Sequence, residues 1–213
     1  MIIAIDGPAA SGKGTVGKRI AVYYGLAHLD TGALYRAVAR DTLAAGYDAA
    51  NAKAALTASK ALDPATLDDP CLRRPALGEA ASVVARDPDV RAALLAYQRD
   101  FARQRPGAVL DGRDIGTVSC PDAVVKLFVT ASPEERARRR YKELEASGVS
   151  ITEALVLADI RRRDARDSGR ETAPLRQAED AYLLDTTNLD IDAAFRTAIN
   201  VIDAAMGHAG RVV

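Results

Sequence analysis

The sequence has few of the residues that would indicate an exported or zinc-binding protein. Its two cysteines, Cys71 and Cys120, stand far apart without a metal-ligand spacing, so we expect two free thiols in a reducing cytoplasm. Its two histidines, His28 and His208, form no metal or catalytic pattern, and we expect surface or packing roles for both. The composition therefore argues against a disulfide framework or a cysteine–histidine metal centre.

The sequence also lacks an excess of charge of either sign and any long hydrophobic run. The 29 basic residues equal the 29 acidic ones, which argues against a surface-wide affinity for nucleic acid or for an anionic membrane. The opening MIIAIDGP has no signal-peptide pattern, and no stretch is long enough to cross a bilayer. We therefore expect a soluble, cytoplasmic, monomeric protein with no nucleic-acid or membrane partner.

What the sequence does have is a succession of short apolar runs separated by helical patterns. Its 213 residues, 48% of them hydrophobic, suit one α/β domain with small inserts. Helical connections favour parallel strands, and nearly continuous apolar strands indicate a sheet covered on both faces. The sequence therefore predicts a three-layer α/β fold around a parallel five-stranded sheet. The predicted strands are residues 2–5, 26–30, 108–111, 124–130 and 181–186.

A phosphate-binding loop, GPAASGKGT, follows the first predicted strand and precedes a helical pattern over residues 13–24. Its glycines let several backbone N–H groups point at one anion, and the helix adds its positive N-terminal end. Lys13 supplies a charge for the β- and γ-phosphates. This P-loop predicts bound ATP, and its contact residues are Gly7, Pro8, Ala9, Ala10, Ser11, Gly12, Lys13, Gly14 and Thr15.

The P-loop departs from the usual pattern after its lysine. Gly14 stands where a Ser or Thr ordinarily meets Mg²⁺, and the hydroxyl comes one residue later, at Thr15, which we take as the magnesium contact, directly or through water. The form G-x-x-x-x-G-K-G-T looks like that of nucleoside monophosphate kinases. Transfer between two anionic nucleotides requires cations and the exclusion of water, so we expect a second arginine-rich site and a mobile basic cover.

Three stretches supply groups for that second site. They are, in chain order, "LDTGALYRAV", "GEAASVVARDPDVRAAL" and "VLDGRDIGT". The third places polar residues at the carboxyl end of a buried strand, where ligands of open α/β sheets bind. An alternative is that DGRD is only a turn with a structural Arg–Asp pair. Asp111 either orients Mg²⁺ through water or fixes Arg113. The candidate acceptor-binding residues are Thr31, Arg36, Ser82, Arg91, Asp111, Arg113 and Asp114.

The third feature is a concentration of nine arginines within residues 136–170. "SPEERARRRYKELE" predicts a helix with Ser132 as its N-cap. For the arginines of that helix two interpretations stay open, namely a solvated face with partners such as Glu134–Arg138 and Glu135–Arg139, or phosphate contact. In "RRRDARDSGR" the spacing i, i+3, i+7 puts three arginines on one helix face, which favours contact with phosphate. Those arginines are Arg163, Arg166 and Arg170.

Taken in order, these stretches resemble the bacterial cytidylate kinase family, which phosphorylates CMP and dCMP with ATP. The resemblance spans residues 5–192 and includes "IDGPAASGKGT", "LDTGALYR", "VLDGRDIGTVSCPDAVVKLFV", "RRRDARDSGRETAPL" and "LLDTTNLDID". It implies a P-loop kinase fold, ATP and Mg²⁺ as cofactors, and CMP or dCMP as the small-molecule partner. It also implies that CMP is held by Ser82, Arg91, Arg113 and Asp114 with Arg36 near its phosphate, and that ribose and lid contacts come from Arg163, Asp167 and Arg170.

The chemistry of cytosine fits the implied base contacts. A carboxylate such as Asp114 accepts from the 4-amino group, and an arginine such as Arg91 donates to N3 and O2. Uracil reverses both hydrogen bonds, and each mismatched buried group costs about 1–3 kcal/mol. The family usually has a small antiparallel sheet in this region, but residues 62–78 are short and proline-broken, so we expect loops there.

The sequence therefore predicts one kinase domain that transfers the γ-phosphoryl group of Mg-ATP to CMP or dCMP. Charge stabilisation is assigned to Lys13, Arg113, Arg163, Arg166 and Arg170. The alternatives are a kinase for UMP, AMP or shikimate, and a nucleotide-binding module without transfer activity. The expected parts are a core of residues 1–30, 106–132 and 175–213, a CMP-binding insert of about residues 31–105, and a lid of about residues 133–174.

Overall fold

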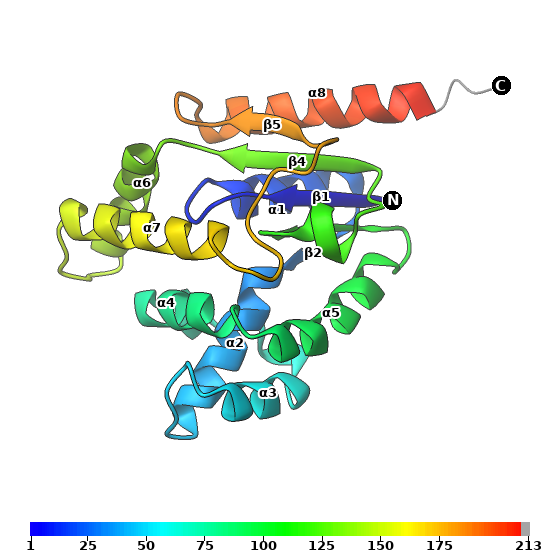
Figure 1. Ribbon diagram of the computed structural model, residues 1–213. Helices are drawn as coiled ribbons and strands as arrows, with labels where there is room; N and C mark the ends of the chain where they lie inside the picture. Colours follow the sequence, from blue (N-terminus) through cyan, green and yellow to red (C-terminus); the bar gives the residue numbers. More distant parts are fainter. Residues whose placement is uncertain (210–213) are drawn as a thin grey trace.

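A parallel five-stranded sheet forms the middle of the protein in a computed structural model that describes residues 1–209 (Figure 1). The strand order is β2-β3-β1-β4-β5, and every pair is parallel. Each end lies within one residue of its predicted place, so the predicted α/β fold is confirmed. The strands are β1 (Ile2–Asp6), β2 (Ala27–Asp30), β3 (Ala108–Gly112), β4 (Val125–Thr130) and β5 (Tyr182–Asp185).

Helices cover both faces of the sheet (Figure 1). Side chains of a strand alternate between its faces, so Ile3 and Ile5 of β1 pack with Val16 and Ile202, whereas Ala4 packs with Leu34. The first face carries α1 and α8, and the second carries helices of the segment from α2 to α5. The described helices are α1 (Lys13–Tyr24), α2 (Thr31–Ala44), α3 (Ala52–Lys60), α4 (Pro75–Val84), α5 (Pro88–Ala102), α6 (Pro133–Ala146), α7 (Glu153–Ser168) and α8 (Ile191–Ala209).

The segment between β2 and β3 contains α2 to α5 and no strand. Its proline-rich middle forms two 3₁₀ turns, Pro64–Thr66 and Pro70–Arg73. In each turn proline occupies the first position, where its missing N–H costs nothing, and the preceding aspartate caps the turn by accepting a backbone N–H at 2.8–2.9 Å. The absence of an antiparallel sheet in this segment agrees with the expectation from its length.

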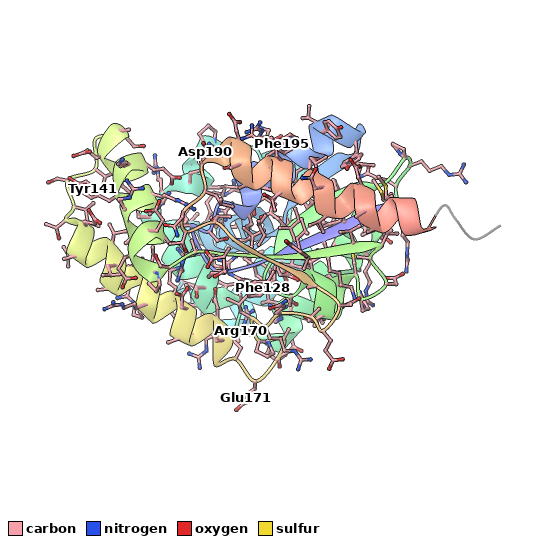
Figure 2. The ribbon with its side chains drawn as sticks, turned by 90° about the horizontal axis from the view of Figure 1, so that it is seen from above. Phe128, Tyr141, Arg170, Glu171, Asp190 and Phe195 are labelled. Atoms are coloured by element: carbon pink, nitrogen blue, oxygen red, sulfur yellow. The ribbon has the colours of Figure 1, made fainter. Side chains whose placement is uncertain are left out.

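Helices α6 and α7 pack against each other around a small core of Ala137, Leu144, Val156 and Ile160. Ser132 caps α6, as predicted, by accepting the N–H of Glu135 at 3.2 Å. The prediction that three arginines share one helix face is wrong for Arg170, because α7 ends at Ser168 and Gly169 follows as its cap. Figure 2 shows Arg170 in the chain beyond α7, beside Glu171; Arg170 is buried and Glu171 is exposed.

The carboxyl ends of three neighbouring strands meet at one edge of the sheet. The register pairs Asp30 of β2 with Asp111 of β3, and Asp6 of β1 with Gly112. The P-loop leaves β1 at this edge, which is where open α/β sheets bind ligands. In residues 1–209, no helix is both long and apolar enough to span a bilayer.

Gly112 fits this edge only because it has no side chain. A Cβ placed there would lie 2.5 Å from Thr31 Oγ1 and 2.8 Å from Ile115 Cδ1. We expect Gly112→Ala to lower the free energy of unfolding in urea by about 1–3 kcal/mol, because the neighbours must move. Gly207→Ala is the control, since no atom lies within 4 Å of its added Cβ. Equal stability of Gly112→Ala and the wild type would contradict this packing.

Candidate active site

The P-loop wraps tightly between β1 and α1. Gly7 has φ +154°, and a Cβ there would lie 1.9 Å from the carbonyl oxygen of Val129, so only glycine fits. Gly12 ends the loop with φ +86°, and α1 begins at Lys13. Lys13 folds back over the loop and donates to the carbonyl oxygen of Pro8 at 3.0 Å. The loop therefore has the strand–glycine–helix geometry that cradles phosphates.

The two hydroxyl groups of the loop differ in their exposure. Ser11 Oγ is buried and has no hydrogen-bond partner among the described residues. Thr15, the predicted magnesium contact, is exposed in the first turn of α1. The space that a side chain of Gly14 would enter faces Asp111, whose Oδ1 lies 3.7 Å from a Cβ placed there.

Lys13 lies in a region of converging positive charge. Burial, together with the positive charge of Arg113 and Arg163, lowers its pKa to about 7, against the opposing effect of Asp111 and Asp30. These cations come from the P-loop, the loop after β3 and α7. Their mutual repulsion is the expected electrostatic signature of an anion-binding cleft.

Asp167 of α7 is a meeting point of predicted acceptor-site residues. Its carboxylate accepts from Ser82 Oγ at 3.1 Å and from Arg113 Nε at 2.9 Å. Against the effect of burial, Arg113 and Arg170 hold the pKa of Asp167 below its usual value. The structure thus brings together side chains from α4, the loop after β3, and α7.

The two predicted base readers, Arg91 and Asp114, form a buried ion pair. Arg91 also lies 5.7 Å from the ring centroid of Tyr35, measured from Cζ. Arg113 pairs with Asp167 and with neither aspartate of DGRD, so that motif contains no internal ion pair. Tyr35 was missed by the sequence analysis, although it stands one residue before Arg36.

Arg36 is held beside Asp30 across Gly32. Its NH2 group donates to Asp30 Oδ2 at 2.6 Å, and a Cβ at Gly32 would lie 2.8 Å from Arg36 NH1. Nε of Arg36 is buried and has no partner among the described residues. Thr31 uses its hydroxyl to donate to the carbonyl oxygen of Asp111 at 2.8 Å, which ties α2 to the end of β3.

The three arginines predicted to belong to a lid differ in their contacts. Arg166 donates to Glu79 of α4 at 2.6 Å, and Arg170 donates to the carbonyl oxygen of Ala173 at 2.8 Å. Arg163 passes Gly78, where an added Cβ would lie 3.4 Å from its NH1 group, and burial followed by Arg113 lowers its pKa. Each of these three arginines has one buried N–H group without a partner among residues 1–209.

The arginines of α6 form two groups according to their contacts, and their contact with phosphate stays a prediction. Arg138 and Arg140 form exposed ion pairs with Glu135 and Glu143. The proposed partner of Arg138, Glu134, instead pairs with Arg161. Arg138 thus lies on the solvated face, whereas Arg140 is half-buried and also donates to the carbonyl oxygen of Arg73 at 3.2 Å.

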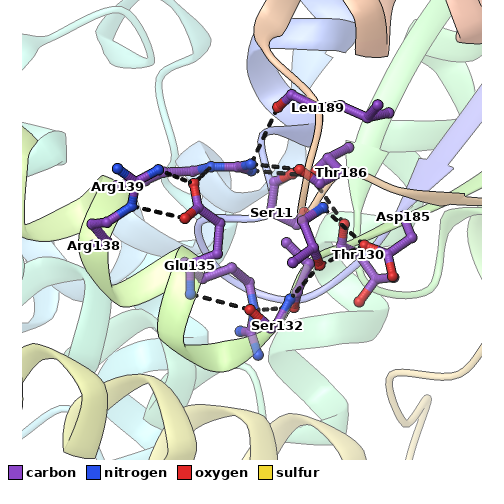
Figure 3. Close-up of polar contacts among 12 residues, drawn as sticks. Ser11, Thr130, Ser132, Glu135, Arg138, Arg139, Asp185, Thr186 and Leu189 are labelled. Carbon is purple, nitrogen blue, oxygen red and sulfur yellow. Dashed lines mark hydrogen bonds and ion pairs between the residues drawn. The ribbon is translucent and has the colours of Figure 1, made fainter.

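Arg136 and Arg139 reach the P-loop region. Arg136 binds Asp164 through two nitrogens and donates to the carbonyl oxygen of Ala9 at 3.2 Å. Figure 3 shows Arg139 held by Glu135 and reaching Thr186, whose hydroxyl donates to the carbonyl oxygen of Ser11 at 3.1 Å. These contacts link α6 to the P-loop and to the segment after β5.

Asp111 does not fix Arg113, which was one of its two predicted roles. Its Oδ2 instead lies 2.9 Å from Nε2 of His28, a residue to which the sequence assigned a surface or packing role. The side chain of His208 lies outside the described part of the chain. His28 was missed because a lone histidine on a short strand gives no local signal.

Asp6 is a second missed residue, although it directly precedes the P-loop. Its two carboxylate oxygens accept the N–H groups of Ile115 and Gly116, each at 2.7 Å. Burial raises its pKa to about 6, against the effect of these hydrogen bonds. Asp6 therefore connects the end of β1 to the π-helical turn Ile115–Ser119 that follows DGRD.

Together, the parallel sheet and the P-loop, with the arginine side chains gathered near it, are the features of a P-loop kinase. Comparison with known proteins gives the family. A cytidylate kinase family model matches residues 3–204. The chain is 56% identical over 212 residues to a cytidylate kinase of Rhodopseudomonas palustris (strain TIE-1), with 100% of both chains covered, and 57% identical with the same coverage to one of Bradyrhizobium sp. (strain ORS 278).

The chain therefore belongs to the cytidylate kinase family and is an enzyme, a nucleoside monophosphate kinase. A solved structure, a gluconokinase from Sinorhizobium meliloti 1021, resembles it with a TM-score of 0.50 at 16% identity, covering 99% of this chain and 97% of that one. This second comparison concerns the fold alone.

The raised pKa of Asp6 predicts a pH-dependent stability. Its carboxyl group binds a proton more tightly in the folded than in the unfolded state, so its contribution is fully present below about pH 4 and is lost as pH rises through about 6. Asp6→Asn does not titrate, and its single oxygen satisfies only one backbone N–H. We expect the stability of the wild type relative to Asp6→Asn to fall by about 2 kcal/mol between pH 4 and pH 7. Urea unfolding at several pH values measures this, and a pH-independent difference would contradict it.

Proposed function

We propose that the protein transfers the γ-phosphoryl group of ATP to CMP or dCMP, giving ADP and the corresponding cytidine diphosphate. The observation that carries the proposal is a set of buried arginine N–H groups that have no hydrogen-bond acceptor among the described residues. These groups are Arg36 Nε, Arg163 Nε, Arg166 NH1 and Arg170 Nε. Phosphate oxygens satisfy such donors and neutralise their charge.

Each site has a role in this transfer. The P-loop backbone and Lys13 bind the ATP phosphates, and the acceptor phosphate of CMP lies against Arg36 and Arg113. Lys13, Arg113 and the lid residues Arg163, Arg166 and Arg170 then stabilise the charge of the transferring group in a water-poor cleft. The acceptor oxygen of CMP is already anionic, so the chain needs no nucleophile and no strong base.

Mg²⁺ fits the oxygen groups beside the P-loop. Thr15 and Asp111 supply the hydroxyl and carboxylate oxygens that this ion prefers, and Mg²⁺ commonly takes its other ligands from phosphates and water. The described residues contain no cluster of three or more His, Cys, Asp or Glu side chains that could hold a metal, which suits an ion that arrives with the nucleotide. When bound, Mg²⁺ neutralises phosphate charge and orients the β- and γ-phosphates.

Arg91 and Asp114 are preorganised to read cytosine. They are paired in a buried position next to Tyr35. A base that binds between them takes over hydrogen bonds of this pair, so it must offer an acceptor to the guanidinium of Arg91 and a donor to the carboxylate of Asp114. Cytosine offers both in that order, and uracil offers the reverse. Ser82 and Asp167, joined at 3.1 Å, form the neighbouring wall.

An acceptor panel tests the proposal. ADP release is measured with CMP, dCMP, UMP, AMP and shikimate at equal concentrations, and we expect turnover with CMP and dCMP to exceed the others. Rapid turnover with AMP or shikimate and none with CMP would overturn it. Calorimetric titration with CMP tests the alternative of a binding module, since a module that binds only ATP does not take up CMP.

Asp114→Asn tests the base-reading role directly. The amide can donate to the uracil carbonyl, so we expect the ratio of kcat/KM for UMP to that for CMP to rise about tenfold or more. General damage lowers both values and leaves their ratio unchanged. Asp122→Asn, at an exposed position, is the matched control. An unaltered ratio in Asp114→Asn would remove Asp114 from base recognition.

A further inference from the structure

His28 and Asp111 form a hydrogen-bonded pair next to the P-loop, on neighbouring strands β2 and β3. Nε2 of His28 lies 2.9 Å from Oδ2 of Asp111, and the two side chains are 21% and 3% exposed. A carboxylate only accepts, so Nε2 is the donor and carries the proton. The contact comes from the same face of the sheet that α1 covers, since both residues lie against glycines of that helix.

The pair occupies a groove on α1 that two glycines leave open. An added Cβ at Gly14 would lie 3.7 Å from Oδ1 of Asp111, and one at Gly17 would lie 3.3 Å from Nε2 of His28. Residues three apart share a helix face, so the carboxylate and the imidazole lie one above the other along the first turn of α1. Gly14, which replaces the usual Ser or Thr after the P-loop lysine, is therefore the residue of the loop that Asp111 approaches.

One carboxylate oxygen of Asp111 has no hydrogen-bond donor among the described residues. His28 holds Oδ2, and Thr31 binds the backbone carbonyl of the same residue at 2.8 Å. Within residues 1–209 the structure records no donor to Oδ1. The charges that face this carboxylate are those of Lys13 and, across the strand register, Asp30.

We propose that His28 is a positioning residue for the metal-dependent binding of ATP. By holding Oδ2 of Asp111, it fixes the carboxylate in the orientation that leaves Oδ1 for the hydration shell of Mg²⁺. Hydrogen-bond partners of carboxylates at metal sites generally tune metal affinity in this way. This inference rests on the proposed function, because it requires that the P-loop bind Mg-ATP.

Calorimetric binding of ATP to the free enzyme, with excess Mg²⁺ and with EDTA, tests the inference without measuring turnover. The readout is the ratio of the two dissociation constants, that is, the gain in affinity that the metal provides. We expect His28→Phe, which keeps a ring but loses the donor, to reduce this gain about three- to tenfold and to leave metal-free binding unchanged. His28→Gln keeps a donor and is expected to retain most of the gain.

The Asp111→Asn background separates action through Asp111 from other effects. If His28 acts through this carboxylate, His28→Phe has no further effect on the metal-dependent gain once Asp111 is replaced. The inference would be overturned if His28→Phe left the metal-dependent gain unchanged, or if it weakened ATP binding equally with and without Mg²⁺. It would also be overturned if His28→Phe and His28→Gln reduced the gain equally, or if His28→Phe reduced it by the same factor in the Asp111→Asn background. Failure of the wild type to bind ATP under any condition would instead overturn the proposed function on which it rests. Thermal unfolding of each variant confirms that it is folded.

Discussion

Positive charge gathered at buried and half-buried positions around Lys13 is the constraint on which the rest of this structure depends. Lys13, Arg113 and Arg163 come from three different segments: burial with the charge of Arg113 and Arg163 lowers the pKa of Lys13, and burial with the charge of Arg113 lowers the pKa of Arg163. Burying such groups without enough carboxylates lowers the stability of the fold. The stabilising free energy must therefore come from the two apolar clusters that pack against the sheet. Asp167 partly offsets the repulsion by joining Ser82 to Arg113.

The features that the sequence predicts correctly are those marked by a pattern of neighbouring residues. The P-loop has fixed glycine spacing, each strand is a short apolar run, and Ser132 with Pro133 marks the start of α6. Because parallel strands align their carboxyl ends, these signals also predict that residues after β1, β2 and β3 converge. The strand ends accordingly lie within one residue of their predicted places.

The pairing of charged side chains was not predictable, because partners lie far apart along the chain. Arg166 pairs with Glu79, 87 residues away, and Asp6 binds backbone groups more than 100 residues distant. A helical spacing rule placed Arg170 on α7, but the helix ends before it. The same rule correctly paired Glu135 with Arg139 and failed for Glu134, which finds Arg161 across the α6–α7 packing instead.

Helix α7 joins the residues around the P-loop to the predicted acceptor-binding residues. Its Asp164 binds Arg136, which contacts the P-loop carbonyl of Ala9, and its Asp167 binds the acceptor-side residues Ser82 and Arg113. A single helix thus contacts both the residues around the P-loop and the predicted acceptor-binding residues. A ligand that moved α7 at one end would shift its partners at the other, and thermodynamic reciprocity makes any such coupling equal in both directions.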